Sequence, residues 1–248
     1  GDAALYDLII GGCLIVLVLE ATRRSVSPML PIITIIFLLY AYLGPYLPGD
    51  LGHRGFRVKR IIDHIFMTGE GLWGVPLRVS ATFVYLFVLF GAFLDKIGAG
   101  EYLINLSFAL MGRFRGGPAK AAVVASCAMG SISGSSIANT VTTGAMTIPL
   151  MKKVGFKNHV AGAVEVAAST NGQLMPPIMG AAAFIMAEII GVPYIEIVKA
   201  AFIPAILSYT AIFSIVHIEA VKENIRGLTK EECPPMIKTL ISGLHFLI

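Results

Sequence analysis

The longest stretches without a charged residue place the strongest constraint on this chain. Residues 121–151 contain no Asp, Glu, Lys, Arg or His, and neither do residues 166–187. A helix needs about 20 predominantly apolar residues to cross the roughly 30 Å hydrocarbon core of a bilayer, and both stretches reach that length. Only 14% of the 248 residues are charged, whereas about 25% is usual for a soluble domain. The sequence therefore predicts an all-α integral membrane protein.

The charge distribution indicates the predicted partners. The net charge is +4, and the basic residues lie mostly in short segments between apolar runs. This pattern is typical of cytoplasmic loops in a multi-pass membrane protein, and it does not predict a surface for nucleic acid. We expect the lipid bilayer as a partner and no nucleic acid.

Apolar segments predict the course of the chain through the membrane. Residues 8–19 and 29–43 predict a helical hairpin whose loop, residues 20–28 with Arg23 and Arg24, lies in the cytoplasm. This topology places the basic residues 53–60 on the opposite side of the membrane, which conflicts with the tendency of basic residues to lie in the cytoplasm. A helix from about residue 58 to 69 that lies along the membrane interface would ease the conflict. Residues 79–94 and 195–216 are predicted spans, and residues 101–111 are a short interfacial helix. The chain opens at Gly1 and closes in the apolar run 237–248, so we expect an internal part of a longer protein.

Residues 119–151 predict a re-entrant hairpin. Two apolar arms, residues 119–129 and 137–151, flank a run of small residues at 130–136. At about 1.5 Å per residue each arm covers only about 16–23 Å, too little for a full crossing. Basic residues lie at both mouths of this hairpin: Arg113, Arg115, Lys120, Lys152, Lys153 and Lys157. The chain is therefore expected to enter from the cytoplasm, turn near the membrane midplane and return.

A second interruption is predicted within residues 160–190. Pro176 and Pro177 lack an amide hydrogen, and their rings clash with a helix that continues behind them. Unpaired backbone groups cost several kcal/mol in hydrocarbon, so we expect the hairpin tip and this break to face each other or a cavity.

The two interruptions expose helix ends that suit ions. The carbonyl end of the first arm, near Met129, favours Na⁺, and the amide end of the second, near Ser135, favours a carboxylate. Transporters built on discontinuous helices use this arrangement. The candidate ion- and substrate-binding residues are Ser131, Ser133, Gly134, Ser135, Ser136, Asn139, Thr140, Asn171, Gly172, Gln173, Met175 and Pro176. Na⁺ is expected at backbone carbonyls around Ser131, Ser133 and Gly172.

Other residues have competing interpretations. Gly144 and Thr147 are predicted to serve close helix packing. Glu165 and Glu188 are either functional in-membrane acids or interfacial anchors.

Two further functional classes compete with transport. An intramembrane hydrolase would use Ser133 or Ser135 as nucleophile and His159 or His217 as base, but the serines are predicted at the midplane and the histidines at the membrane edge. A membrane scaffold without transport activity would leave the costly broken helix unexplained.

Several motifs resemble the large membrane subunit of TRAP (tripartite ATP-independent periplasmic) transporters. They are residues 132–136 (ISGSS), 138–139 (AN), 148–152 (IPLMK) and 172–177 (GQLMPP). Residues 19–24 (LEATRR), 44–49 (GPYLPG) and 112–117 (GRFRGG) resemble the branch in which the small and large subunits are fused, commonly paired with TAXI-type binding proteins. The similarity runs through nearly the whole chain.

The resemblance implies a Na⁺-coupled, elevator-type importer of organic acids in the cytoplasmic (inner) membrane of a bacterium or archaeon. H⁺ is the alternative coupling ion, and a periplasmic substrate-binding protein delivers the substrate. This chain would be the first half of an inverted-repeat fold. The implied parts are residues 1–50 as the last two small-subunit helices, 51–117 as arm helices and a span, 118–157 as the re-entrant hairpin, 158–218 as the broken helix and next span, and 219–248 as a cytoplasmic loop and the start of another span.

Overall fold

The computed structural model describes residues 5–243, and nearly all regular structure in that range is helical. The chain forms two compact units, residues 1–78 and residues 79–248. Four helical segments of the described range are long and apolar enough to cross a membrane: Leu5–Ser25, Met29–Tyr46, Val75–Leu94 and Tyr194–Lys222. The predicted all-α membrane class is therefore confirmed at this level.

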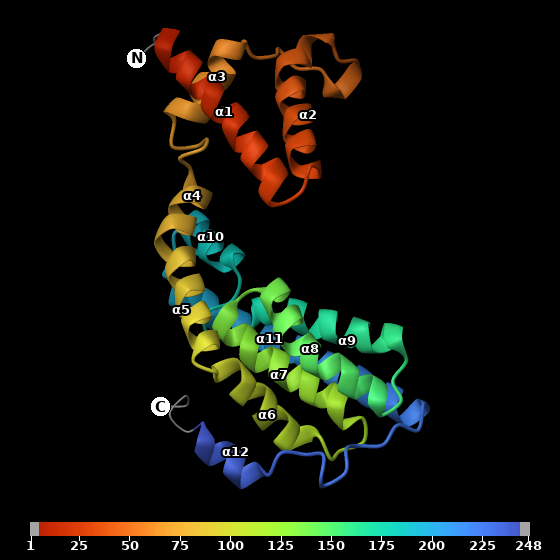
Figure 1. Cartoon of the computed structure of the whole chain (residues 1–248). Helices are drawn as coiled ribbons and strands as arrows, with labels where there is room; N and C mark the ends of the chain where they lie inside the picture. The colour runs from red at the N-terminus through yellow and green to blue at the C-terminus, as the bar shows by residue number, and fades with distance from the viewer. Residues whose placement is uncertain (1–4, 244–248) are drawn as a thin grey trace. The chain divides into compact units, whose positions relative to one another are not determined.

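The first unit is built from three α-helices (Figure 1). They are α1 (Leu5–Ser25), α2 (Met29–Leu43) and α3 (Val58–Met67), with the short 3₁₀ turns η1 (Gly44–Tyr46) and η2 (Gly49–Leu51) after α2. The predicted pair of apolar helices is present, but α1 continues to Ser25, so Arg23 and Arg24 lie on its last turns rather than in a loop. Both side chains bond Glu20, at 2.7 and 2.6 Å, and these i,i+3 and i,i+4 pairs support the extra turn.

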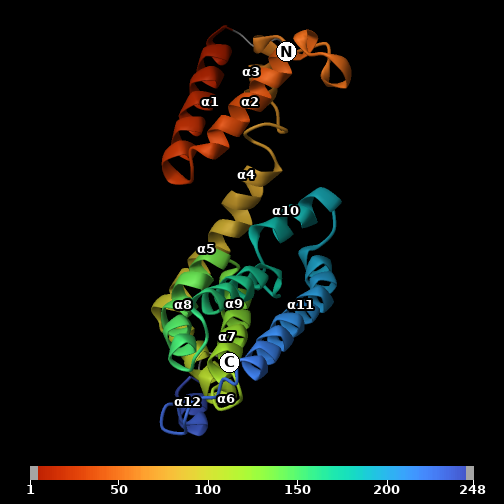
Figure 2. The ribbon, with the colours of Figure 1, turned by 90° about the vertical axis from the view of Figure 1, so that its right-hand side faces the viewer.

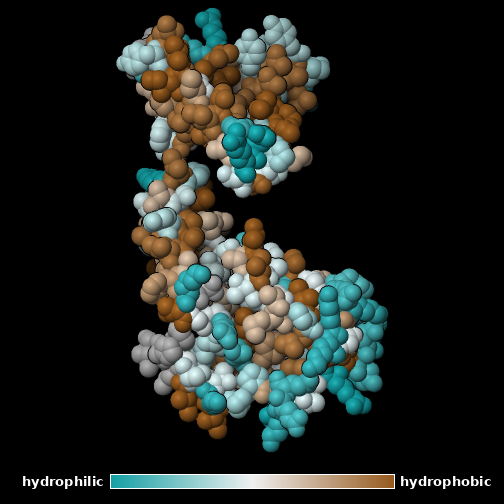
Figure 3. Space-filling view, in the orientation of Figure 1, coloured by the Kyte–Doolittle hydropathy of each residue, from teal (hydrophilic) through white to brown (hydrophobic). Residues whose placement is uncertain are grey.

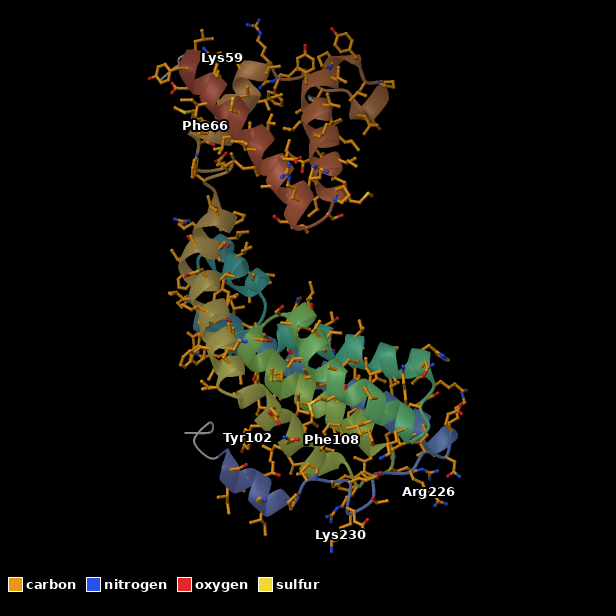
Figure 4. All side chains as sticks on the ribbon, in the orientation of Figure 1. Lys59, Phe66, Tyr102, Phe108, Arg226 and Lys230 are labelled. Carbon is orange, nitrogen blue, oxygen red and sulfur yellow. The ribbon has the colours of Figure 1, made fainter. Side chains whose placement is uncertain are left out.

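Helix α3 confirms the helix expected after the basic segment. Gly11 of α1 lets it approach closely, because a Cβ there would lie 2.9 Å from Ile62 Cγ2 and 3.0 Å from Phe66. Lys59 of α3 is exposed (Figure 4). Thus α3 packs an apolar face on α1 and leaves basic side chains outside, although its position in a membrane stays a prediction.

A helix in three parts follows, and the second unit begins within it, at Val79. These are α4 (Val75–Val79), a π-helical turn, η3 (Ser80–Val84), and α5 (Tyr85–Lys96). The remaining elements are α6 (Ala99–Met111), α7 (Gly117–Ser133), α8 (Ser136–Lys153), α9 (Asn158–Asn171), η4 (Gly172–Leu174), α10 (Ala181–Ile190), α11 (Tyr194–Lys222) and α12 (Met236–Ser242). Helix α12 covers the first residues of the predicted last span, whose residues 244–248 lie outside the described range, so that span stays a prediction.

Helix α7 is the centre of the second unit. It contacts α6, α8, α9 and α11, and Figure 2 shows α11 running along this group. Most of its buried residues are small, and Ala119, Ala121, Ala122 and Ala125 have no exposed surface. Small side chains let helix backbones approach one another, so α7 can be enclosed on several sides.

Two apolar clusters fill the space around α7. One includes Met151 of α8, Ala161 of α9 and Val216 of α11. The other includes Ile104 and Phe108 of α6 with Leu228. Figure 4 shows Phe108 and Tyr102 on α6, which is packed on α7 and α12. The predicted short helix at 101–111 is thus present as part of the bundle.

Apolar side chains cover much of the exterior of each unit (Figure 3). Hydrophilic residues of the second unit gather near the α8–α9 loop and the segment after α11, where Arg226 and Lys230 lie (Figures 3 and 4). Lys153 pairs with Glu232 at 2.6 Å, and Lys157 pairs with Glu223 at 2.9 Å. An apolar exterior with one polar end is typical of a protein whose helices face lipid.

Candidate functional site

A two-residue turn joins α7 and α8. Gly134 adopts a left-handed conformation, with φ +59°, and its N–H donates to Gly130 O at 3.0 Å, which ends α7. Ser135 caps α8 by accepting a hydrogen bond from Ala138 N–H at 3.3 Å. The expected helix end near Met129 is wrong, because α7 continues to Ser133. Arms of 17 and 18 residues are about 26 and 27 Å long, longer than predicted.

The predicted break after α9 is confirmed. Helix α9 ends at Asn171, the turn η4 follows, and α10 begins only at Ala181. Pro176 and Pro177 lie in the gap and are joined by a cis peptide bond. Part of the freed backbone bonds locally: Gly180 N–H donates to the carbonyl of Gln173 at 2.8 Å.

The hairpin tip and the break face each other, as expected. The backbones touch where two glycines meet, since a Cβ on Gly172 would lie only 2.9 Å from Gly130 Cα. Ile178 N–H donates to Ser131 O at 3.3 Å, and Gln173 Nε2 donates to Ser136 Oγ at 2.9 Å. A backbone and a side-chain hydrogen bond thus hold the two interruptions together.

A cavity of about 300 Å³ lies beside the tip. Residues of α5, α6, α7 and α8 line it, and the polar groups among them include Ser133, Ser135 and Asn139. Asn139 is only 1% exposed, and its Nδ2 donates to Ser126 O at 2.9 Å. Its Oδ1 is buried and has no hydrogen-bond partner among the described residues. Asn139 is therefore a cavity-lining residue whose side chain has one buried oxygen without a partner among the described residues.

Three of the predicted residues point their side chains elsewhere. Thr140 Oγ1 donates to the carbonyl of Ser136 in its own helix at 2.8 Å. Asn171 Nδ2 donates to Ser208 Oγ of α11 at 2.6 Å. Met175 packs against the core cluster around α7. Pro176 lies in the break itself. Of the predicted site residues, Ser133, Ser135 and Asn139 line the tip cavity.

Sequence reasoning missed a buried polar cluster behind the tip. Glu165 of α9 has no exposed surface, which rules out the alternative of an interfacial anchor, whereas Glu188 is exposed. Four hydroxyl groups surround its carboxyl group, from Ser126, Thr143, Thr147 and Ser169. The packing role expected for Gly144 is confirmed, because a Cβ there would lie 3.1 Å from Glu165 Cγ.

A signal for this cluster was present in the sequence. Asn139, Thr143 and Thr147 recur at four-residue spacing, and Glu165 and Ser169 repeat the same interval. Residues four apart lie on one face of a helix. Such spacing predicts a polar face on α8 and another on α9, without identifying the helix that each face meets.

The geometry does not assemble a hydrolase. Ser133 Oγ accepts from Ser135 N–H at 3.4 Å, and Ser135 Oγ caps α8. His217 Nδ1 lies 3.0 Å from Lys120 Nζ, and His159 is exposed at the start of α9. No hydrogen bond in the described range joins either histidine to a tip serine, which a nucleophile and its base require.

Comparison with known proteins decides the family. The model of the family described as "Tripartite ATP-independent periplasmic transporter, DctM component" matches residues 13–248. The chain belongs to the DctM family. This family consists of transporter permeases rather than enzymes, in agreement with the apolar spans and the broken helix of the second unit.

Individual DctM relatives resemble parts of the chain. A C4-dicarboxylate TRAP transporter large permease protein DctM from Vibrio cholerae is 38% identical over 91 residues, covering 37% of this chain and 20% of the relative. YgiK from Salmonella typhimurium is 30% identical over 134 residues, 54% of this chain and 31% of the relative. The sialic acid TRAP transporter permease protein SiaT from Haemophilus influenzae is 27% identical over 131 residues, covering 53% of this chain and 21% of the relative. The chain spans less than a third of the length of these three relatives.

Proposed function

We propose that this chain supplies one half of the ion- and substrate-binding core of a TRAP permease that imports organic acids. The support is the pair of facing interruptions, the turn at Gly134 and the break that follows Asn171, beside a cavity lined by Asn139. The buried Oδ1 of Asn139 has no hydrogen-bond partner among the described residues. Irregular backbone at membrane depth is tolerated where protein encloses it or where it lines a cavity. In transporters such interruptions form the binding site for substrate and coupling ion.

The electrostatics of the tip support a cation and an anion side by side. The carbonyl end of α7 and the amide end of α8 meet at Gly134 and Ser135. The first carries a partial negative charge and the second a partial positive charge. A Na⁺ ion would bind at the end of α7, and a substrate carboxylate at the start of α8.

Backbone carbonyls are the proposed sodium ligands, around Ser131, Ser133 and Gly172. The carbonyl of Ser131 accepts from Ile178 N–H at 3.3 Å, and that of Gly172 accepts from Met175 N–H at 3.1 Å. A carbonyl oxygen has two lone pairs, so each retains one for an ion. H⁺ coupling is the alternative at the level of the whole transporter.

The whole transporter is expected to contain more than this chain spans. A second, inverted hairpin and broken helix would complete the site. The hairpin of this chain, α7 and α8, would re-enter an inner membrane from the cytoplasmic side. We propose that the permease is of the fused type, moves its substrate by an elevator mechanism and receives it from a periplasmic binding protein of the TAXI type. The relatives named for a C4-dicarboxylate and for sialic acid support an organic acid as the substrate class.

Uptake into proteoliposomes tests this function. The full-length permease should accumulate its substrate only with an inward Na⁺ gradient and the cognate binding protein. Asn139→Ala removes the unpartnered oxygen and should lower uptake about tenfold or more, the equivalent of about 1.4 kcal/mol. Thr140→Val, one residue away, removes a hydroxyl that bonds only its own helix, and it should transport like the wild type.

Two results would contradict the proposal. Uptake that is indifferent to Na⁺ and to the binding protein would exclude the mechanism. Equal uptake by the Asn139→Ala and Thr140→Val variants would remove Asn139 and the tip cavity from the site.

A further inference from the structure

An apolar groove lies among α1, α2 and α3 of the first unit, and its volume is about 320 Å³. Helix α3 lines it with one face, because residues three and four apart are neighbours on a helix: Val58, Ile61, Ile62 and Ile65. Tyr42 lines it from α2, and the other lining residues are aliphatic or glycine. Val58 is 55% exposed and Tyr42 is 49% exposed, so the groove opens to the exterior at that end. Hydrocarbon covers such apolar surface favourably.

The basic segment, residues 53–60, adjoins the open end of this groove. Phe56 N–H donates to the carbonyl of Ala41 at 2.9 Å, which fixes the segment beside Tyr42 at the end of α2. Arg57 is the N-cap residue of α3 and directly precedes the first residue of that helix in the groove lining. Basic side chains and the mouth of an apolar groove therefore lie next to each other.

No carboxylate neutralises this basic segment. Residues 51–62 contain neither Asp nor Glu. Among the residues that the structure describes, no ion pair involves the four exposed basic side chains of the segment: Arg54, Arg57, Lys59 and Arg60. Their positive charge is thus available to an anion from outside the unit.

The ring of Phe56 gathers two of these side chains. The guanidinium carbon of Arg54 lies 6.0 Å from the ring centroid, and that of Arg60 lies 5.7 Å from it. Arg60 is also three residues after Arg57, so both lie on the same side of the first turn of α3. Guanidinium groups present several N–H donors in a fixed plane, which suits the oxygens of a phosphate.

We propose that the first unit binds an anionic phospholipid, with its phosphate at Arg57 and Arg60 and one acyl chain in the groove among α1, α2 and α3. Clusters of Lys and Arg on an amphipathic helix attract anionic headgroups, and the apolar face of such a helix enters the acyl region. The groove supplies the apolar half of this recognition and the basic segment supplies the charged half. The site lies wholly within residues 1–78 and is independent of the proposed transport site.

Native mass spectrometry of the purified full-length permease tests this site without any transport assay. The probes are dioleoylphosphatidylglycerol, which carries a negative charge, and dioleoylphosphatidylcholine, which has the same acyl chains and no net charge. The wild type should retain phosphatidylglycerol in preference to phosphatidylcholine. Inorganic phosphate should not displace the lipid, because a free anion lacks the chain that fills the groove.

A double variant tests the charged half of the site. Arg57→Gln with Arg60→Gln should bind phosphatidylglycerol about tenfold or more weakly, since each basic side chain near an anionic lipid contributes to binding. Both side chains are exposed and unpaired among the described residues, so the fold should persist. The matched control is Arg23→Gln with Arg24→Gln, which also removes two charges from the first unit, at side chains paired with Glu20. This control should bind like the wild type.

Gly12 of α1 tests the apolar half. A Cβ at Gly12 would lie 3.8 Å from Ile62 Cδ1, which is an ordinary contact, so Gly12→Ala should bind phosphatidylglycerol like the wild type. Gly12→Leu places further carbon atoms in the groove. It should weaken phosphatidylglycerol binding although no charge has changed.

Three results would overturn the proposal. One is equal retention of phosphatidylglycerol and phosphatidylcholine by the wild type. Another is equal binding by the two arginine double variants, which would remove the basic segment from the site. The third is equal lipid binding by Gly12→Leu and Gly12→Ala, or the loss of a protein subunit from Gly12→Leu, which would assign the groove to a protein contact.

Discussion

Gly172→Ala tests the contact that joins the hairpin tip to the broken helix. The new Cβ would lie 2.9 Å from Gly130 Cα and 3.0 Å from Asn139 Nδ2, whereas ordinary contacts begin at 3.4 Å. The first of these atoms is backbone and cannot rotate away. The φ of Gly172 is −55°, which alanine adopts without strain, so any cost arises from the contact.

The magnitude follows from the shift that the contact demands. The two backbones must separate by about 0.5 Å at their closest point, and added atoms in a packed interior cost about 1–3 kcal/mol. We expect Gly172→Ala to lower the apparent melting temperature of the full-length permease. Because the tip moves away from the break, uptake should fall as well.

Gly162→Ala is the matched control. Gly162 lies in α9, ten residues earlier, and a Cβ there meets nothing within 4 Å. Alanine is about 1 kcal/mol more favourable than glycine inside a helix, so this variant should be more stable than the wild type. If Gly172→Ala were as stable and as active as Gly162→Ala, the tip would not be docked as described.

Two further predictions concern the packing around the site and the polar end of the unit. Tyr209→Phe removes the 3.0 Å hydrogen bond from its hydroxyl to a backbone carbonyl of α9, which should destabilise the protein by about 1 kcal/mol in thermal unfolding. The hydrogen bond from Lys153 lowers the pKa of Glu232 from 4.5 to about 2. A depressed carboxyl pKa stabilises the fold above pH 4.5, and the gain is lost as the pH falls to about 2, so the stability advantage of the wild type over Glu232→Gln should vanish across that window. An advantage independent of pH would exclude the ion pair as its source.

The sequence predicts the fold well where the signals are local. Long uncharged runs predicted the apolar helices. Pro176 and Pro177 predicted the break after α9, because a missing amide hydrogen affects the helix within one turn. The cost of unpaired backbone groups in lipid also predicted that the hairpin tip and the break face each other.

Helix ends were less predictable. Residues 130–133 are Gly and Ser rich, and their weak helix propensity predicts a loop, yet α7 continues to Ser133. Tertiary contact overrides the propensity: the missing side chain of Gly130 admits the backbone at Gly172, and Ser131 Oγ bonds the carbonyl of Ala128 at 2.7 Å. At the end of α1, pairing of Glu20 with Arg23 and Arg24 has a similar effect.

The cluster at Glu165 could be predicted only in part. Spacing places Thr143 and Thr147 on one face of α8, but spacing does not say which helix that face meets. The hydrogen bonds to Glu165 depend on the tight packing of α8 and α9, which arises from Gly144 and from the turn that joins the two helices. Such pairings between distant segments are fixed by the folded structure.

Membrane depth of the α7–α8 turn is the most direct test of re-entry. Spin labels would be attached at residues 115, 135 and 152 of the full-length permease, after replacement of Cys13, Cys127 and Cys233. We predict that the label at 135 lies roughly 10 Å or more inside the hydrocarbon core, and that the other two lie in water on the same side. Labels at 115 and 152 on opposite sides of the bilayer, or a label at 135 in water, would contradict the account.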